Sequence, residues 1–93
     1  GTVIENQIIN GSLRITAADV VIKNCVIKYN GTWGIDAEGA KNITVQNCDI
    51  TGAGTSGISN AAILGSGNFI GNDISKSENG IVLQNGASTV KGN

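Results

Sequence analysis

Two stretches of the chain are versions of one line: Val-Val-Ile-Lys-Asn-Cys-Val-Ile at 20–27 and Ile-Thr-Val-Gln-Asn-Cys-Asp-Ile at 43–50. Both contain the template apolar, any, Asn or Gly, any, any, Ile. Three further copies, the last one truncated, start at Ile4, Phe69 and Val90. The third template position falls at 6, 24, 47, 71 and 92, so the repeat is 18 to 24 residues long. A short repeat of this kind indicates units that stack on one another.

A second line, usually opened by glycine, lies between the copies of the first. Its apolar lead residues are Leu13, Ile35, Ile58 and Ile81. Apolar and polar residues alternate along both lines, as in residues 43–46, and this alternation is the period of a β-strand. One unit of about three short strands cannot bury its own apolar row. Stacked units can, because each apolar residue then lies about 4.8 Å above its equivalent in the next unit.

The stacking predicts three internal columns of apolar residues. The first column contains Ile4, Ile22, Val45, Phe69 and Val90. The second contains Ile9, Ile27, Ile50 and Ile74, and the third contains the lead residues Leu13, Ile35, Ile58 and Ile81. Three columns indicate an all-β fold, a solenoid with three parallel sheets. Residues 1–93 then form one segment whose coils start near 4, 22, 45 and 69, with a partial fifth at 90.

A corner between the first two sheets is marked by asparagine or glycine in every coil. The connection there is only about two residues long, and so sharp a bend needs left-handed φ, which Asn and Gly tolerate. We expect the asparagine side chains to stack and hydrogen-bond amide to amide along the axis. The residues of this Asn/Gly ladder are Asn6, Asn24, Asn47, Gly71 and Gly92.

Composition excludes several classes of function. The chain has no proline, histidine or methionine, so an imidazole base, a Ser–His pair and a His-ligated metal are impossible. A net charge of −1 with 14% charged residues gives no electrostatic basis for binding nucleic acid. No apolar run approaches the roughly 20 residues of a membrane-spanning helix.

The lines at 20–27 and 43–50 resemble the right-handed parallel β-helix repeats of the pectate-lyase-like superfamily, and the resemblance covers essentially the whole chain. It implies a right-handed, single-stranded parallel β-helix of about four coils. That superfamily includes polysaccharide lyases, glycoside hydrolases, epimerases, phage tailspikes and non-catalytic surface proteins. In its enzymes the substrate lies across the outer face of one sheet, often with calcium. No catalytic signature of the family matches here, so the resemblance assigns no catalytic residue.

Members of this superfamily usually have many more coils and covered ends. The last line of this chain stops in mid-repeat, at Gly92-Asn93. Uncapped parallel sheets expose strand edges that invite pairing. We therefore expect an excerpt of a longer β-helix, flanked by further coils. The alternative is end-to-end association of identical chains.

The outer face of the third sheet is the analogue of the family's binding face. Its outward row should be Arg14, Asp36, Ser59 and Val82, although the register of the third coil is ambiguous. Glu38, two residues after Asp36, should point to the same face. Paired carboxylates can serve acid/base sugar chemistry or bind a hard cation, and Arg14 can pair with Asp36 or hold a substrate carboxylate. The alternative is a solvated sheet face with a modest ion pair.

Two aromatic residues add to this candidate contact. Trp33 is expected in the long loop of the second coil, and Tyr29 precedes it by four residues. Exposed aromatic rings offer sugars an apolar area with a polar edge. A carbohydrate contact would then consist of Trp33, Asp36, Glu38, Arg14 and Tyr29. Alternatively, Trp33 folds over the loop and shields the edge of the sheet.

Two pairs of residues occupy equivalent positions in neighbouring coils. Asp49 and Asp73 would stack about 4.8 Å apart, where calcium could bridge the two carboxylates or water and salt could screen them. Cys25 and Cys48 lie within disulfide reach on Cα spacing alone. Small thiols also fill a buried column well, and we expect free, buried cysteines with no special reactivity.

Two functional hypotheses follow. The first is a segment of an extracellular or cell-surface β-helix that binds or processes polysaccharide, in which this segment is mainly a rigid scaffold. If the parent protein is an enzyme, a polysaccharide lyase, hydrolase or epimerase is expected; this hypothesis rests partly on fold-level analogy. The second is a purely structural solenoid that acts as a spacer or stacks end to end. The sequence predicts no cofactor, and calcium at Asp49 and Asp73 is only the alternative described above.

Overall fold

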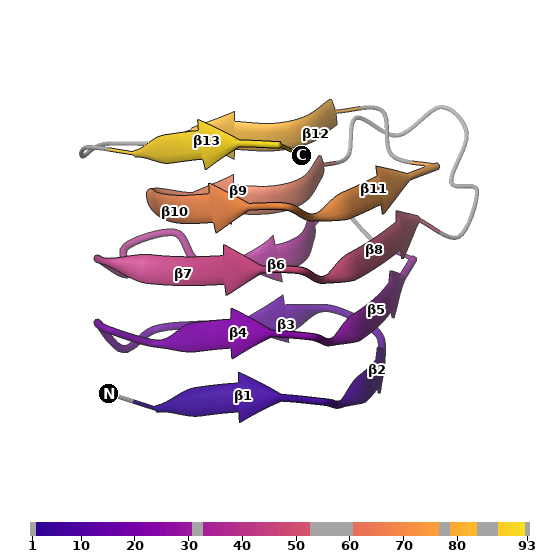
Figure 1. Cartoon of the computed structure of the whole chain (residues 1–93), viewed down its shortest axis with the longest axis horizontal. Coiled ribbons are helices and arrows are strands. Elements are labelled where there is room, and N and C mark those ends of the chain that lie inside the picture. The colour runs from indigo at the N-terminus through magenta and orange to yellow at the C-terminus, as the bar shows by residue number, and fades with distance from the viewer. Residues whose placement is uncertain (1, 31–32, 53–60, 77–78, 84–87, 93) are drawn as a thin grey trace.

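The computed structural model describes residues 2–30, 33–52, 61–76, 79–83 and 88–92. Within these ranges every regular element is a β-strand, and all strand pairing is parallel. The chain passes through three sheets in turn and rises by one strand per coil (Figure 1). The protein is a right-handed parallel β-helix of about four coils, which confirms the fold predicted from the repeats.

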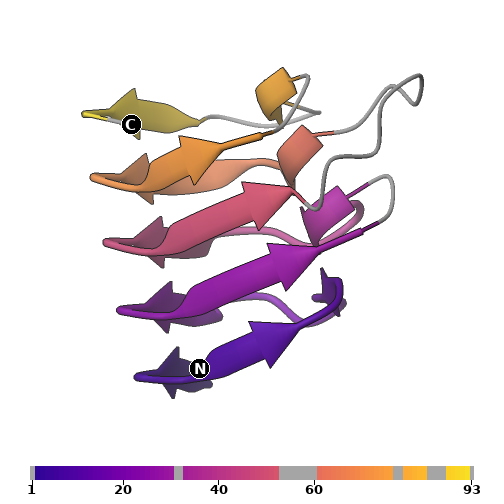
Figure 2. The same cartoon turned by 90° about the vertical axis from the view of Figure 1, so that its right-hand side faces the viewer.

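Each sheet takes one strand from each coil. The first sheet contains, in order, β1 (Val3–Glu5), β4 (Val21–Lys23), β7 (Ile43–Gln46), β10 (Gly67–Ile70) and β13 (Thr89–Lys91). The second sheet contains β2 (Ile8–Asn10), β5 (Val26–Tyr29), β8 (Asp49–Gly52) and β11 (Asp73–Ser75), which face the viewer in Figure 2. The third sheet contains β3 (Leu13–Arg14), β6 (Trp33–Asp36), β9 (Ala61–Gly65) and β12 (Asn79–Leu83).

The strand register confirms the first two apolar columns. Residues of the first column pair directly along the sheet in the order Ile4, Ile22, Val45, Phe69 and Val90. Residues of the second column pair in the order Ile9, Ile27, Ile50 and Ile74. In the middle coils these side chains are fully buried, and with the ring of Tyr29 they form the core. Burial of such aliphatic side chains contributes about 1.5–3 kcal/mol each to folding.

The third column corrects the prediction in one coil. Ile35 pairs with Ile63, and Ile63 pairs with Ile81, so Ile63 occupies the position expected for Ile58. Ile58 itself lies outside the described residues. The physical reason is an uneven connection. A single residue, Ser66, joins β9 to β10, whereas six residues join β6 to β7. The additional residues of the third coil therefore precede β9 instead of following it.

The Asn/Gly corner has the predicted backbone conformation. Asn6, Asn24 and Asn47 have φ of 58°, 53° and 53°, and Gly71 and Gly92 follow at 64° and 66°. The expected amide-to-amide ladder is wrong, because the three asparagine side chains are exposed and none bonds to another among the described residues. Backbone hydrogen bonds connect the corners instead, each N–H donating to a carbonyl of the next coil at 2.9–3.3 Å.

A second corner, at the entrance to the first sheet, does carry a side-chain hydrogen bond between two coils. Asp19 and Asn42 have φ of 61° and 55°. The Nδ2 of Asn42 donates to the Oδ1 of Asp19 at 2.7 Å, and the backbone N–H of Asp19 donates to the carbonyl of Lys41 at 3.1 Å. These contacts join the first and second coils just before β4 and β7 begin.

Candidate functional site

The two aromatic candidates lie in different environments from those expected. Trp33 is the first residue of β6 and not part of a loop; its ring is half-buried, and its carbonyl accepts a hydrogen bond from the Ser12 hydroxyl at 2.6 Å. Tyr29 ends β5 and is fully buried in the core. A buried ring offers no surface to a sugar, so Tyr29 is removed from the candidate contact.

The outward row of the third sheet is polar only in its first two coils. Arg14 pairs in register with Asp36, as predicted, but the next residue of the row is Leu64 and not Ser59. Leu64 is buried, with 2% of its surface exposed, and pairs with the half-buried Val82. Ser59 lies outside the described residues. A charged groove along this face is therefore absent from the described part of β9.

The two carboxylates of the second coil do not form a strand pair. The strand β6 ends at Asp36, and Glu38 lies in the turn that follows. The backbone N–H of Glu38 donates to Oδ1 of Asp36 at 3.1 Å, and the N–H of Ala40 donates to the carbonyl of Ala37 at 3.0 Å. Asp36 thus shapes the turn, in the manner of an Asx turn, and directs Glu38 outward into solvent.

This turn forms one wall of a pocket with a volume of about 340 Å³. The pocket lies where the third coil turns from β9 to β10 through Ser66 alone, beside the longer connection of the second coil. We call it the corner notch. Its lining residues are Ala37, Glu38, Gly39, Ala40, Lys41, Gly65 and Ser66.

The corner notch combines charged, hydroxyl and small apolar groups. Glu38 and Lys41 are exposed at its rim. Neither forms an ion pair with a described residue; the ion pair found there joins Glu5 and Lys23. Ser66 is only 6% exposed. Its Oγ makes no hydrogen bond to a described residue. Every fully buried polar side-chain atom in the described part of the chain has a hydrogen-bond partner, so this Oγ is not fully buried and opens into the notch.

These groups can recognise a small polar ligand. A carboxylate accepts hydrogen bonds, an ammonium donates them and a hydroxyl does both. The volume of the notch lies at the lower end of the range typical of small-molecule sites, about 300–1,000 Å³. Sequence reasoning identified Glu38 but missed Lys41 and Ser66, since their proximity depends on the unequal lengths of two corners.

The stacked aspartates do not form a closed metal site in the structure. Asp49 pairs in register with Asp73, as the repeat predicts, and both residues are exposed. The Thr51 hydroxyl donates to Oδ1 of Asp49 at 3.4 Å and lies 3.2 Å from the Ser75 hydroxyl. No group of three or more potential metal-binding side chains gathers within the described ranges.

The two cysteines are free thiols inside the solenoid. Cys25 is 1% exposed and Cys48 is 2% exposed. Burial raises the pKa of the Cys48 thiol above its ordinary value, and backbone hydrogen bonds from Cys25 and Gln46 partly oppose this rise. A buried thiol with a raised pKa is a poor nucleophile.

The next residue of the cysteine column is Asn72, which sequence reasoning missed. Asn72 is 4% exposed and its side chain hydrogen-bonds to the backbone of the coil below. Its position, directly after the corner residue Gly71, matches that of Cys25 and Cys48 after Asn24 and Asn47. This equivalence in the repeat could have identified Asn72 from the sequence.

The comparisons with known proteins give no match: no family model, curated protein or solved structure is significantly similar to the chain. In the described part of the chain no helix is long and apolar enough to cross a membrane.

Proposed function

We propose that the chain is a segment of a carbohydrate-binding β-helix and that its corner notch holds one unit of a polysaccharide. The Ser66 hydroxyl, which hydrogen-bonds to no described residue and lines the notch with Glu38 and Lys41, carries this proposal. A hydroxyl that opens into a pocket can donate to a ligand and accept from it in place of water. Polyhydroxylated ligands suit such a mixture of donors and acceptors.

The ligand would lie between the notch and β6. Glu38 accepts hydrogen bonds from sugar hydroxyls, Lys41 and Ser66 donate to sugar oxygens, and Ala37 and Ala40 contact the apolar ring face. Trp33 begins the strand that leads into the notch, and its half-exposed ring can extend the contact by stacking. The proposal concerns binding, with the rest of the coil as a rigid support.

The pectate-lyase-like superfamily is the proposed relationship, supported by three parallel sheets stacked in register around aliphatic columns. Many unrelated activities share such folds, so the fold alone supports only the class of ligand. We place the binding outside the cell or at its surface, where structural polysaccharides occur.

An array of neutral and acidic polysaccharides tests the proposal. The wild-type chain is expected to bind at least one class. Glu38→Gln, Ser66→Ala and Trp33→Ala are each expected to weaken binding about tenfold, the effect of losing one good contact. Glu5→Gln and Lys23→Gln, on the first sheet, are matched controls that should bind normally. Binding to no polysaccharide, or equal binding by all variants, would contradict the proposal.

A structural role is the second candidate, favoured by the apolar side chains at the two ends of the stack. Val3 and Ile8 are 51% and 73% exposed at one end, and Leu83 and Val90 are 51% and 49% exposed at the other. Such edges suit contact with further coils of β-structure. On this second proposal the segment is a spacer within a longer solenoid.

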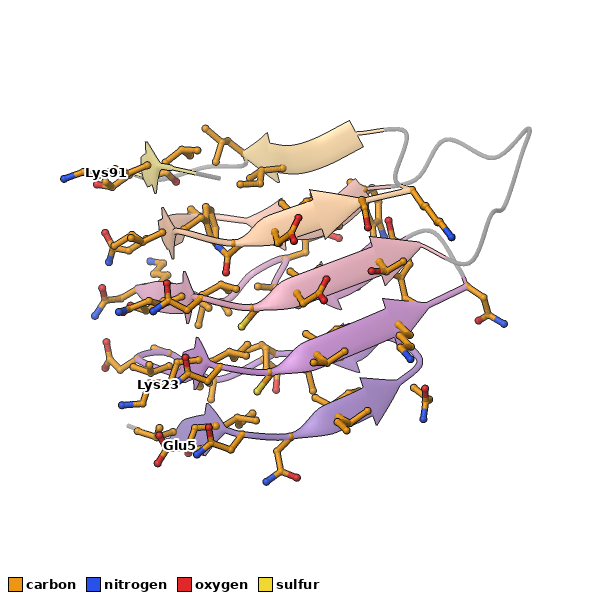
Figure 3. The ribbon with its side chains drawn as sticks, turned by 45° about the vertical axis from the view of Figure 1, so that its right-hand side comes forward. Glu5, Lys23 and Lys91 are labelled. Atoms are coloured by element: carbon orange, nitrogen blue, oxygen red, sulfur yellow. The ribbon has the colours of Figure 1, made fainter. Side chains whose placement is uncertain are left out.

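End-to-end stacking of identical chains would be favoured by the charges at the two ends and opposed by the unequal number of strands in the sheets. Glu5 and Lys91 belong to one outward row of the first sheet and lie at its opposite ends (Figure 3), so a stacked copy would bring opposite charges into register. The first sheet has five strands and the other two have four. A copy placed on β13 would thus leave a gap one strand high in two sheets. This mismatch in strand number opposes self-stacking.

A further inference from the structure

The two thiols occupy equivalent positions one coil apart. The Sγ of Cys25 lies 3.6 Å from the carbonyl oxygen of Ile4, and the Sγ of Cys48 lies 3.6 Å from that of Ile22. Ile4 and Ile22 are themselves register partners in the first sheet. Each sulfur therefore has the same relationship to the coil below it.

A second pair of contacts repeats in the same way. The Sγ of Cys25 lies 3.3 Å from the carbonyl oxygen of Lys23, and that of Cys48 lies 3.4 Å from that of Gln46. Lys23 and Gln46 are also register partners. Because both sulfurs keep both distances to register partners one coil apart, we take their separation as the spacing between coils, about 4.8 Å.

This separation suits one particular coordination geometry. A zinc–thiolate bond is about 2.3 Å long, so two bonds of that length in line span about 4.6 Å. A disulfide bond is only about 2.05 Å long, and forming one would require the sulfurs to approach by more than 2 Å or so. The stacked pair is thus arranged to take an ion between the sulfurs more easily than to join them.

We propose that Cys25 and Cys48 form a two-coordinate site for a single soft d10 cation, held in line between the two sulfurs. Thiolate is the ligand that such soft cations select. Binding breaks two S–H bonds, forms two sulfur–metal bonds and releases two protons to solvent. With a divalent ion such as Hg(II) the bis-thiolate is neutral, which suits a buried site.

The surroundings discriminate against harder or more demanding ions. Zinc takes four ligands in structural sites, and among the described residues no third metal-binding side chain joins the pair. Both thiols are buried, so the ion enters through local opening of the corner, and binding is slow.

The test uses the whole chain and Hg(II) as the probe, in chloride-free buffer with long incubation. Native mass spectrometry is expected to show one mercury per chain with the loss of two protons. X-ray absorption should give two sulfur ligands at about 2.3 Å. Both cysteines should then resist alkylation in denaturant, and Zn(II) should not be retained.

Single substitutions test whether the two sulfurs act together. Cys25→Ser and Cys48→Ser should each weaken Hg(II) binding by more than about a hundredfold, whereas Ser75→Ala on the outer face should not change it. Circular dichroism first establishes that each variant is folded. If a serine variant does not fold, the ligand number and the alkylation protection of the wild-type chain decide the question. Two ions per chain, three or more ligands, or unchanged affinity of a folded single variant would overturn the proposal.

Discussion

The side-chain Oδ1 of Asn72 accepts a hydrogen bond from the backbone N–H of Cys48, 3.0 Å away in the coil below. The Nδ2 of the same amide donates to the carbonyl of Val45, also at 3.0 Å. The buried side chain of Asn72 thus satisfies both a backbone donor and a backbone acceptor of the neighbouring coil. The thiol of Cys48 contacts the equivalent carbonyl one coil lower, that of Ile22, and the thiol of Cys25 contacts that of Ile4, two coils lower, but a thiol is a weaker donor than an amide.

Substitution of Asn72 tests the energetic weight of this contact. Asn72→Ala leaves the Cys48 N–H and the Val45 carbonyl without the amide, and should lower the free energy of unfolding by about 1–3 kcal/mol. Asn72→Cys should cost less, because a thiol at this position can donate to Val45 as Cys48 donates to Ile22. Urea denaturation measures both. Equal stability of the alanine and cysteine variants would be inconsistent with this role.

The left-handed corner predicts the response to substitution at Asn24. Its φ is 53° and its side chain is exposed, so the backbone conformation decides the outcome. Asn24→Ala should lower the free energy of unfolding by about 1 kcal/mol, and Asn24→Gly should leave it nearly unchanged. Lys28→Ala, on an exposed strand position, is the control. An alanine variant as stable as the glycine variant would disprove the conformational explanation.

The tight turn that forms the corner notch depends on Gly67. Its φ is 147°, and a Cβ there would overlap the backbone of Ile43 in the coil below. Gly67→Ala should therefore destabilise the protein by at least about 2 kcal/mol. Gly80→Ala is the matched control, since a Cβ at Gly80 meets nothing within 4 Å. Similar melting temperatures for the two variants would contradict this packing.

The Cys48 thiol predicts how stability changes in alkaline solution. Burial raises its pKa above the ordinary 9.0. As the pH rises the unfolded chain loses this proton first, so ionisation favours the unfolded state and stability falls from about pH 9 upward. Cys48→Ala removes this contribution and should flatten the fall. Urea denaturation between pH 7 and 11 or so measures it. Identical pH dependence of the two proteins would refute the assignment.

Much of the fold can be predicted from the sequence because each coil repeats the same weak residue pattern. A single Asn24 or Ile27 says little, but the same residue types at the same offsets in each coil define columns and corners. The third coil was misassigned because Ile58 and Ile63 both fit an apolar lead position. Spacing alone does not reveal whether extra residues precede or follow a strand.

Less of the candidate site was predictable. Glu38 was identified from its distance to Asp36, yet the strand ends between them and the pair is broken. Ser66 carries no signal by itself; its importance arises because a one-residue corner lies beside a six-residue connection. Tyr29 illustrates the reverse case, in which a residue type favoured at sugar sites fills the core.

The binding proposal is tested most directly by NMR titration of the isotopically labelled chain with the polysaccharide fragment that it binds best. We expect chemical-shift changes concentrated in residues 36–41 and 65–66, with a smaller change at the Trp33 indole. The Ser66→Ala variant should show weaker, non-saturating shifts at the same positions. Changes confined to the outer faces of the first or second sheet, or no changes at any concentration, would contradict the corner notch as a carbohydrate site.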